Sequence, residues 1–174
     1  MRSEVDAARV REFMRELGRS TSESARVYLV GGGTAVLHGW REMTADLDIK
    51  FVSEVDLGPV LSDLKQRLNL NIELASPDLF IPPLPGWEER SQFIQREGKI
   101  DFFHFDLYSQ ALSKIERGFD RDLDDVAAMI ETGGVDRARL LELFLAIKPE
   151  LNRYPALDPS TFERAVRRIL TVCF

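Results

Sequence analysis

Apolar positions near the start of the chain recur at roughly helical spacing, which predicts an amphipathic helix over residues 4–18 with Gly18 as its stop. The run 26–30 is β-branched and aromatic and predicts a buried strand. Three glycines, residues 31–33, break this run, and residues 34–39 predict a short helix. The opening of the chain therefore predicts a helix, a strand, a glycine turn and a second helix.

The next segment changes to a period of two. Apolar side chains in residues 46–52 alternate with Asp46, Asp48 and Lys50. Because side chains of a strand point to opposite faces in turn, this alternation predicts a half-buried strand with one polar face. Both aspartates then project from that polar face.

The remaining pattern continues with helices and short strands. Residues 57–68 carry an apolar stripe and predict a helix that Asp56 caps, and residues 71–74 predict a third strand. Residues 75–90 are rich in proline, which predicts an irregular segment. Residues 91–105 predict a hairpin.

The last third of the chain is helical in pattern. The hairpin turn is expected at Glu97-Gly98, and Ser160 with Glu163 predicts a capping box. Helices are expected over four ranges: 107–117, 120–131, 136–147 and 160–171. The predicted fold class is α+β (α/β), with a small mixed sheet, crossover helices and a helical C-terminal part. We expect a single domain over 1–174, with a sheet core at 26–105 and helices at 106–174.

Composition narrows the class of protein. The chain has 174 residues, 44% of them hydrophobic, with a formal net charge of −6 and a sequence pI of about 5.1. This balance argues against a general nucleic-acid coat protein, which needs a basic face. Cys173 is the only cysteine, so no disulfide forms within one chain, and its place near the end argues against a catalytic thiol.

The same composition bears on localisation. The first residues are charged and amphipathic rather than an apolar signal core, and no stretch approaches about 20 apolar residues. We therefore expect a cytoplasmic protein that does not associate with a membrane.

The glycine turn is the first candidate for chemistry. A strand that runs through glycines into a helix exposes backbone N–H groups at the positive end of that helix, which favours an anion. Gly32 and Gly33 allow a phosphate to approach the backbone, and Thr34 adds a hydroxyl donor. These residues predict a phosphate-binding turn.

The aspartate pair is the second candidate. Asp46 and Asp48 repel each other unless a cation lies between them, and Mg²⁺ binds through one or two carboxylates together with substrate phosphates. A third carboxylate is expected from a neighbouring strand, with Glu73 as the first choice and Asp101 as the alternative. The pattern predicts a site for Mg²⁺ or Mn²⁺ that polarises an α-phosphate.

Each motif alone is weak, since glycines after a strand are often only a turn and Asp-x-Asp is often a solvated strand face. Their order along the chain strengthens both. A dinucleotide fingerprint is excluded because Val36 stands where its third glycine belongs, and the Gly-Lys-Ser/Thr of a P-loop is absent.

These residues resemble a known family. Gly32-Gly33-Thr34-Ala35, then Leu-His-Gly and Arg41, then Thr-x-Asp-Leu-Asp resemble motif I of the polymerase-β-like nucleotidyltransferases. The similarity is greatest to the AbiEii-like group, the toxin components of abortive-infection toxin–antitoxin systems, and to the DUF6036 group. The downstream run from Lys114 to Val126 resembles the later motifs of that group, in which a helix lysine precedes an Asp-x-x-Asp segment.

The resemblance implies a role for each matching position. Gly32, Gly33, Thr34 and Arg41 would bind the triphosphate, and Asp46 and Asp48 would bind the metal. Lys114 would reach a phosphate, and Asp122 or Asp125 would orient that lysine or act as a base. A purely structural interpretation is also open, in which Lys114 is an ordinary helix residue and the aspartates form the acidic first turn of the next helix.

Three functions follow from these observations. The first is an Mg²⁺-dependent enzyme that moves a nucleoside monophosphate from a triphosphate to an RNA, protein or small-molecule acceptor, with a cognate antitoxin as a partner. The second is a binding or regulatory protein of the same fold, antitoxin-like, with weak or no catalysis and with a cognate toxin as a partner. The third is a scaffold whose acidic face binds no metal.

The two histidines leave alternatives open. His38 follows the glycine turn and either contacts phosphate or packs on its helix. His104 either orients a substrate together with Asp106 or simply pairs with it.

Overall fold

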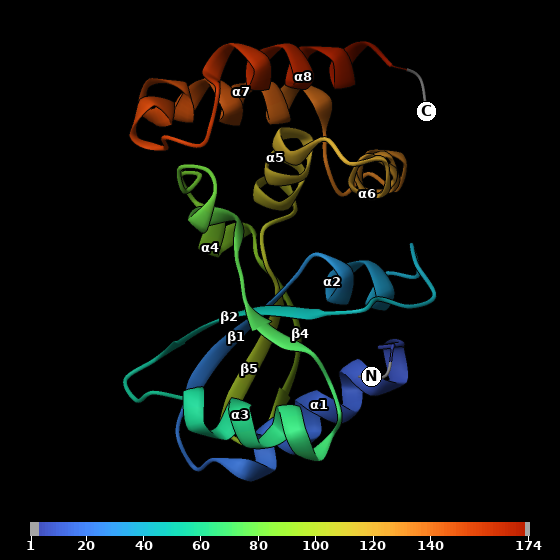
Figure 1. Ribbon diagram of the computed structural model, residues 1–174, viewed down its shortest axis with the longest axis vertical. Coiled ribbons are helices and arrows are strands. Elements are labelled where there is room, and N and C mark those ends of the chain that lie inside the picture. The colour runs from blue at the N-terminus through green and yellow to red at the C-terminus, as the bar shows by residue number, and fades with distance from the viewer. Residues whose placement is uncertain (1–3, 173–174) are drawn as a thin grey trace. The chain divides into compact units, whose positions relative to one another are not determined.

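The computed structural model describes residues 4–172, and Cys173 lies outside this range (Figure 1). The chain divides into two compact units. Unit 1 runs through Ser76 and resumes over Ser91–Phe105, whereas unit 2 consists of Pro77–Arg90 and the chain from Asp106 onward. The proline-rich segment therefore groups with the helices, and it carries two short helical turns, η1 (Pro77–Leu79) and α4 (Trp87–Arg90).

Unit 1 contains a five-stranded mixed sheet in the order β3-β2-β1-β5-β4, which confirms the predicted fold class. Its strands are β1 (Ala25–Val30), β2 (Leu47–Ser53), β3 (Ile72–Leu74), β4 (Gln92–Glu97) and β5 (Ile100–His104). The central strand β1 pairs antiparallel with β2 and parallel with β5. At the edges, β3 is parallel to β2 and β4 is antiparallel to β5.

Two helices and one face of this sheet enclose the core of unit 1. Helix α1 (Ala7–Ser20) and helix α3 (Gly58–Arg67) pack against each other and bury apolar side chains together with the strands. The alternate strand residues that face this core include Leu29, Ile49 and Phe102, each fully buried. The short helix α2 (Gly32–Leu37) follows β1 directly. The alternation predicted for residues 46–52 is therefore confirmed.

The opposite, polar face of the sheet carries three rows of side chains that the strand register sets side by side. Alternate residues of each strand share a face, so each row runs across the strands. The acidic row consists of Val30, Asp48 and Glu73. The aromatic row consists of Lys50, Tyr28, Phe103 and Phe93. The charged row consists of Val52, Arg26, Asp101 and Arg96.

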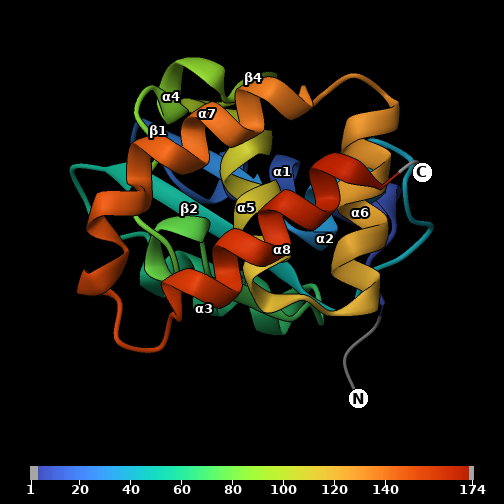
Figure 2. The ribbon, with the colours of Figure 1, turned by 90° about the horizontal axis from the view of Figure 1, so that it is seen from above.

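Unit 2 is built around helix α5 (Leu107–Arg117). This helix contacts α6 (Asp120–Glu131), α7 (Arg137–Ile147) and α8 (Pro159–Thr171). Helices α7 and α8 lie side by side in both views, and the 3₁₀ turn η2 (Lys148–Arg153) contacts both (Figure 2). All four predicted helices are present, within one residue of their expected limits. No helix within residues 4–172 has the length and apolar character needed to cross a membrane.

The structure corrects three local predictions. The predicted capping box is wrong, because Asp158 caps α8 by accepting from the Thr161 amide at 2.8 Å, and Glu163 forms ion pairs instead. Gly18 lies inside α1, which continues to Ser20, rather than ending it. A Cβ there would lie 2.6 Å from the Glu97 carbonyl oxygen, so the close approach of α1 to β4 requires glycine. The hairpin turn itself is shifted by one residue, to Gly98-Lys99.

Candidate active site

The glycine turn lies directly against one of the predicted metal-binding aspartates. Gly31 follows β1 and has a φ of +57°, a conformation that favours glycine. A Cβ at this position would lie 3.3 Å from the Asp48 Oδ2 atom. The structure therefore brings the Asp48 carboxylate to the turn, as the predicted site requires.

The glycines that follow are buried and serve packing. A Cβ on Gly32 would overlap the Thr44 hydroxyl, and a Cβ on Gly33 would lie 2.8 Å from Leu47. Thr34 is fully buried, and its hydroxyl donates to the Leu29 carbonyl at 3.0 Å. The predicted contact of this hydroxyl with phosphate does not fit, because the hydroxyl points into the protein. Arg41 lies half-buried in the loop between α2 and β2.

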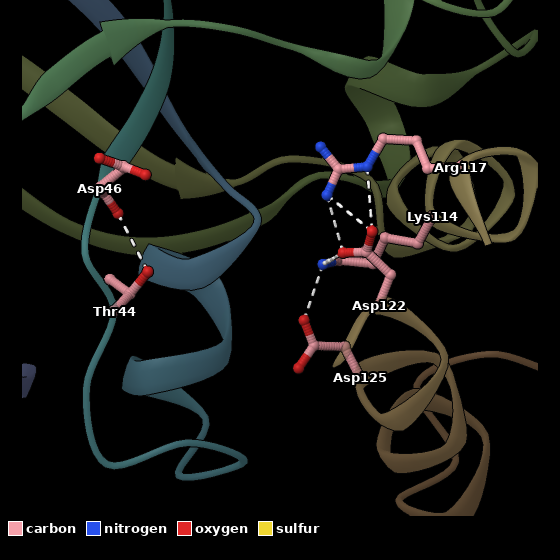
Figure 3. Close-up of polar contacts among 6 residues, drawn as sticks. All are labelled: Thr44, Asp46, Lys114, Arg117, Asp122 and Asp125. Atoms are coloured by element: carbon pink, nitrogen blue, oxygen red, sulfur yellow. Dashed lines mark hydrogen bonds and ion pairs between the residues drawn. The ribbon is translucent and has the colours of Figure 1, made fainter. Parts of the chain in front are cut away.

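The three predicted metal ligands lie close together in the folded chain. Asp48 belongs to β2, Glu73 belongs to β3, and Asp46 comes just before β2. Asp48 and Glu73 are register partners on these parallel strands, so their side chains lie next to each other on the polar face. Asp46 precedes β2, and its carbonyl accepts from the Thr44 hydroxyl at 3.2 Å (Figure 3). All three carboxylates are at least partly exposed, and Lys50 is the next residue on the same face of β2.

A residue that sequence reasoning missed joins two of these carboxylates. The Asn71 amide nitrogen donates to Asp46 Oδ1 at 2.5 Å and to Glu73 Oε1 at 2.8 Å. The backbone of Asn71 is also fixed, since its carbonyl accepts from the Leu47 amide at 2.8 Å. The available signal was its spacing, because a residue two before Glu73 on a strand shares its face.

The alternative third acid, Asp101, lies elsewhere. It belongs to the charged row, two rows and about 13 Å along the strands from Asp48. Arg96 binds both of its oxygens, at 2.6 and 2.8 Å, and this hydrogen bonding holds the pKa of Asp101 below its ordinary value. Of the two candidates, the structure brings Glu73 and not Asp101 to the aspartate pair.

The donor set decides which metal site these residues fit. Within residues 4–172, no three histidine, cysteine or acidic side chains are grouped closely enough to enclose a metal ion. Carboxylate oxygens are hard ligands, and Mg²⁺ keeps several non-protein ligands and binds to one or two carboxylates plus substrate phosphates. Asp46 and Asp48 therefore fit a site that a triphosphate completes, rather than a cage formed by the protein alone.

The histidines form a stack beside α2. The Thr34 hydroxyl hydrogen is directed to Leu29, so its oxygen accepts from His104 Nδ1 at 3.3 Å. The His104 ring lies 4.3 Å from the His38 ring, which stacks on Trp40 at 4.4 Å. Burial, and then the charge of His38, lowers the pKa of His104 to about 3. His104 is therefore a neutral, buried group.

Asp106, which the sequence associates with His104 either in orienting a substrate or in a simple pair, has its own partners within unit 2. Asp106 is buried and binds Arg90 through both oxygens, at 3.0 and 2.7 Å. The same carboxylate caps α5 by accepting from the amides of Tyr108 and Ser109. Its role within unit 2 is to fix the start of α5 and to anchor the proline-rich segment.

Unit 2 contains a second cluster of predicted site residues, an ion cluster buried between α5 and α6 (Figure 3). Lys114 Nζ donates to Asp122 Oδ1 at 3.0 Å and to Asp125 Oδ2 at 2.7 Å. Arg117 binds both oxygens of Asp122, at 2.8 and 2.7 Å. Lys114, Asp122 and Asp125 are 6%, 4% and 1% exposed, so water does not screen these charges.

The electrostatics of this cluster separate the two roles considered for Asp122. Burial alone raises the pKa of Asp122, but the hydrogen bonds and charges of Arg117 and Lys114 outweigh it and leave the pKa below its ordinary value. Asp122 is therefore ionised at neutral pH, with both oxygens engaged. This geometry suits orienting Lys114 and not accepting a proton.

Comparison with known proteins adds one finding. A family model described as nucleotidyltransferase of unknown function (DUF6036) matches residues 7–165, nearly the whole described chain. No curated protein matches the chain. No solved structure matches it either.

Proposed function

Because the chain belongs to the DUF6036 family of nucleotidyltransferases, we propose that it transfers a nucleoside monophosphate from a triphosphate to an acceptor hydroxyl or phosphate. In this proposal Asp46 and Asp48 hold Mg²⁺ or Mn²⁺, and Glu73 is the third acid. The observation that carries it is the position of Asp48, which lies against Gly31 and beside Glu73. That arrangement supports the proposal, because a carboxylate pair beside the glycine turn would hold a cation next to a phosphate bound there.

The reaction forms one bond and breaks one. The acceptor oxygen bonds to the α-phosphorus, the bond from that phosphorus to the bridging oxygen breaks, and pyrophosphate leaves. A hydroxyl acceptor gives up its proton to water. A bound divalent cation supplies charge neutralisation at the phosphates. Asp46 and Asp48 would hold that cation on the polar face, and Gly31 would leave the approach to Asp48 free of a side chain.

The test uses triphosphates labelled at the α-phosphate, with Mg²⁺ or Mn²⁺, and acceptors of three classes: RNA, protein and small molecules. We expect transfer of label by the wild-type protein and none by the Asp48→Asn variant. Asp101→Asn is the matched control, since it removes a carboxylate from the same sheet face in a different row. Absence of transfer to every acceptor class would contradict the proposal.

The resemblance to AbiEii-like toxins supports a finer proposal, that the protein is the toxin of a toxin–antitoxin pair. Expression in a bacterial host tests it by growth arrest. Loss of toxicity in Asp48→Ala would support an enzymatic toxin. Toxicity that persists in this variant would instead support the second function, a binding protein with a weak or inactive site.

The same resemblance supports a phosphate-binding role for Lys114 with Asp122 and Asp125 as its orienting residues. The two carboxylates use two of the three ammonium hydrogens, which fits the orienting role. A Lys114→Arg variant tests it, because a longer, planar cation in a buried pocket is expected to raise the KM for the triphosphate. An unchanged KM in a folded variant would contradict the role.

A further inference from the structure

We propose that Asn71 is a positioning residue of the metal site: it orients Asp46 and Glu73 so that each keeps one oxygen for the cation. This inference rests on the proposed function, because it assigns a task to a residue beside the proposed ligands. Asn71 itself is not proposed to touch the metal or the substrate.

The hydrogen bonding fixes which way the amide faces. Ionised carboxylates only accept hydrogen bonds, so the group that faces both Asp46 and Glu73 must be the NH₂ of Asn71. Its two hydrogens serve one oxygen on each carboxylate, at 2.5 and 2.8 Å. Both carboxylates are thereby gathered at one nitrogen atom and turned in a defined direction.

The amide is held on a rigid part of the sheet. The Asn71 carbonyl accepts from the Leu47 amide, at the point where β2 and β3 begin to pair. On the other side, the Thr44 hydroxyl holds the Asp46 carbonyl. Because the backbone is hydrogen-bonded at both Asn71 and Asp46, the Asn71 amide holds the two carboxylates in defined orientations.

A neutral amide differs from a cation in its effect on the charge of the carboxylates that it contacts. It reduces the repulsion between Asp46 and Glu73, but it does not cancel their charge. The buried carboxylates of unit 2 are instead neutralised by Lys114 and Arg117. Asn71 therefore preserves the negative charge that a divalent cation needs, while removing the conformational freedom that binding would otherwise have to restrict.

The experiment measures Mn²⁺ binding by calorimetry, alone and with a non-hydrolysable triphosphate, on the full chain. Asn71→Leu removes both donors at similar volume, and we expect its Kd for Mn²⁺ to rise by about tenfold or more. We expect kcat to recover when the metal concentration is raised, with little change in the KM for the triphosphate. Gln95→Leu is the matched control, since Gln95 also donates to a carboxylate two residues away, at Glu97.

The outcomes separate the two claims. If the wild-type protein binds no Mn²⁺ with or without the triphosphate, the proposed function and the role of Asn71 are both overturned. If the wild type binds Mn²⁺ and folded Asn71→Leu binds it equally well, only the role of Asn71 is overturned.

A second variant decides the matter if Asn71→Leu does not fold. Asn71→Ser leaves one hydroxyl hydrogen in place of two amide hydrogens, so it cannot donate to both carboxylates. We expect a smaller rise in melting temperature on adding Mn²⁺ than in the wild type. An equal or larger rise would overturn the role.

Discussion

The two carboxylate clusters of this protein differ in what balances their charge. In the ion cluster of unit 2, Lys114 and Arg117 contact the buried aspartates directly. In the acidic cluster of unit 1, Asp46 and Glu73 share a neutral amide and remain partly exposed. The difference teaches that proximity of acids is not enough to identify a metal site; what distinguishes Asp46 and Glu73 is that a neutral amide joins them, whereas two cations bind the buried Asp122 and Asp125.

The largest expected effect concerns the acidic cluster. Asp48→Asn should lower the rate of nucleotide transfer by about 1000-fold or more, because metal coordination contributes several kcal/mol to such reactions. The melting temperature should change little, since Asp48 is not part of the core. Steady-state kinetics and thermal unfolding of the same sample check both statements. A large loss of stability would mean that Asp48 serves the fold.

The ion cluster should respond in the opposite way. Lys114→Met leaves two buried aspartates without their shared cation, and we expect a loss of about 3–5 kcal/mol in the free energy of unfolding. Urea titration measures this loss. Replacing Asp125 with Leu in the same chain should recover part of it, because one uncompensated charge is removed. A stable single variant would show that the cluster contributes little to the fold.

Acid should weaken unit 1 before it weakens the ion cluster. Since the pKa of His104 falls from 6.5 to about 3 on folding, the stability from keeping it neutral is complete above pH 6.5 and is lost as the pH falls toward 3. The loss should reach about 2 kcal/mol by pH 5. Asp122 has a lowered pKa, so its contribution declines only below its ordinary value of 3.8.

The fluorescence of the two tryptophans distinguishes the unfolding of unit 1 from that of unit 2. Trp40 stacks on His38 in unit 1, and Trp87 lies in α4 of unit 2, so Trp87→Phe leaves a probe of unit 1 alone. Urea unfolding at pH 7 and pH 5, followed by Trp40 fluorescence, gives the pH dependence. If His104→Phe leaves that dependence unchanged, the histidine is not its source.

The smallest effect is expected at the charged row. Asp101→Asn should leave the transfer rate and the melting temperature unchanged within error, because its ion pair with Arg96 is exposed and screened by water. A lower transfer rate in Asp101→Asn would instead support Asp101 as a metal ligand. It would also weaken the contrast between the rows of the sheet.

Much of the fold follows from local pattern. The period of two in residues 46–52 located the strand that carries Asp48, and the helical periods located the four helices of unit 2. These features depend on neighbours in sequence, which is why a single sequence reveals them. The sequence also favoured Glu73 over Asp101 as the third acid, and the strand register pairs Glu73 with Asp48. The order of the strands came from the structure alone.

The failures share a physical cause. The inward hydroxyl of Thr34, the partner of His104 and the bridging amide of Asn71 all depend on side-chain contacts made in the folded chain. No periodicity encodes the first two, and strand spacing puts Asn71 on the face of Glu73 without revealing its second hydrogen bond, to Asp46. The helix cap at Asp158 was missed for a different reason: the nearby Ser160 matched a familiar motif, but the preceding Asp158 and Pro159 begin the helix earlier.

The assignment of Pro77–Arg90 to unit 2 has a topological consequence. The main chain passes between the units at 76/77, 90/91 and 105/106, so a single proteolytic cut cannot release either one intact. A fragment that stops at Phe105 would contain Arg90 but not Asp106, the residue to which Arg90 is bound in the whole chain. Each unit is encoded by two separate segments of the gene. An exchange of one unit between relatives would therefore have to replace both of its segments together.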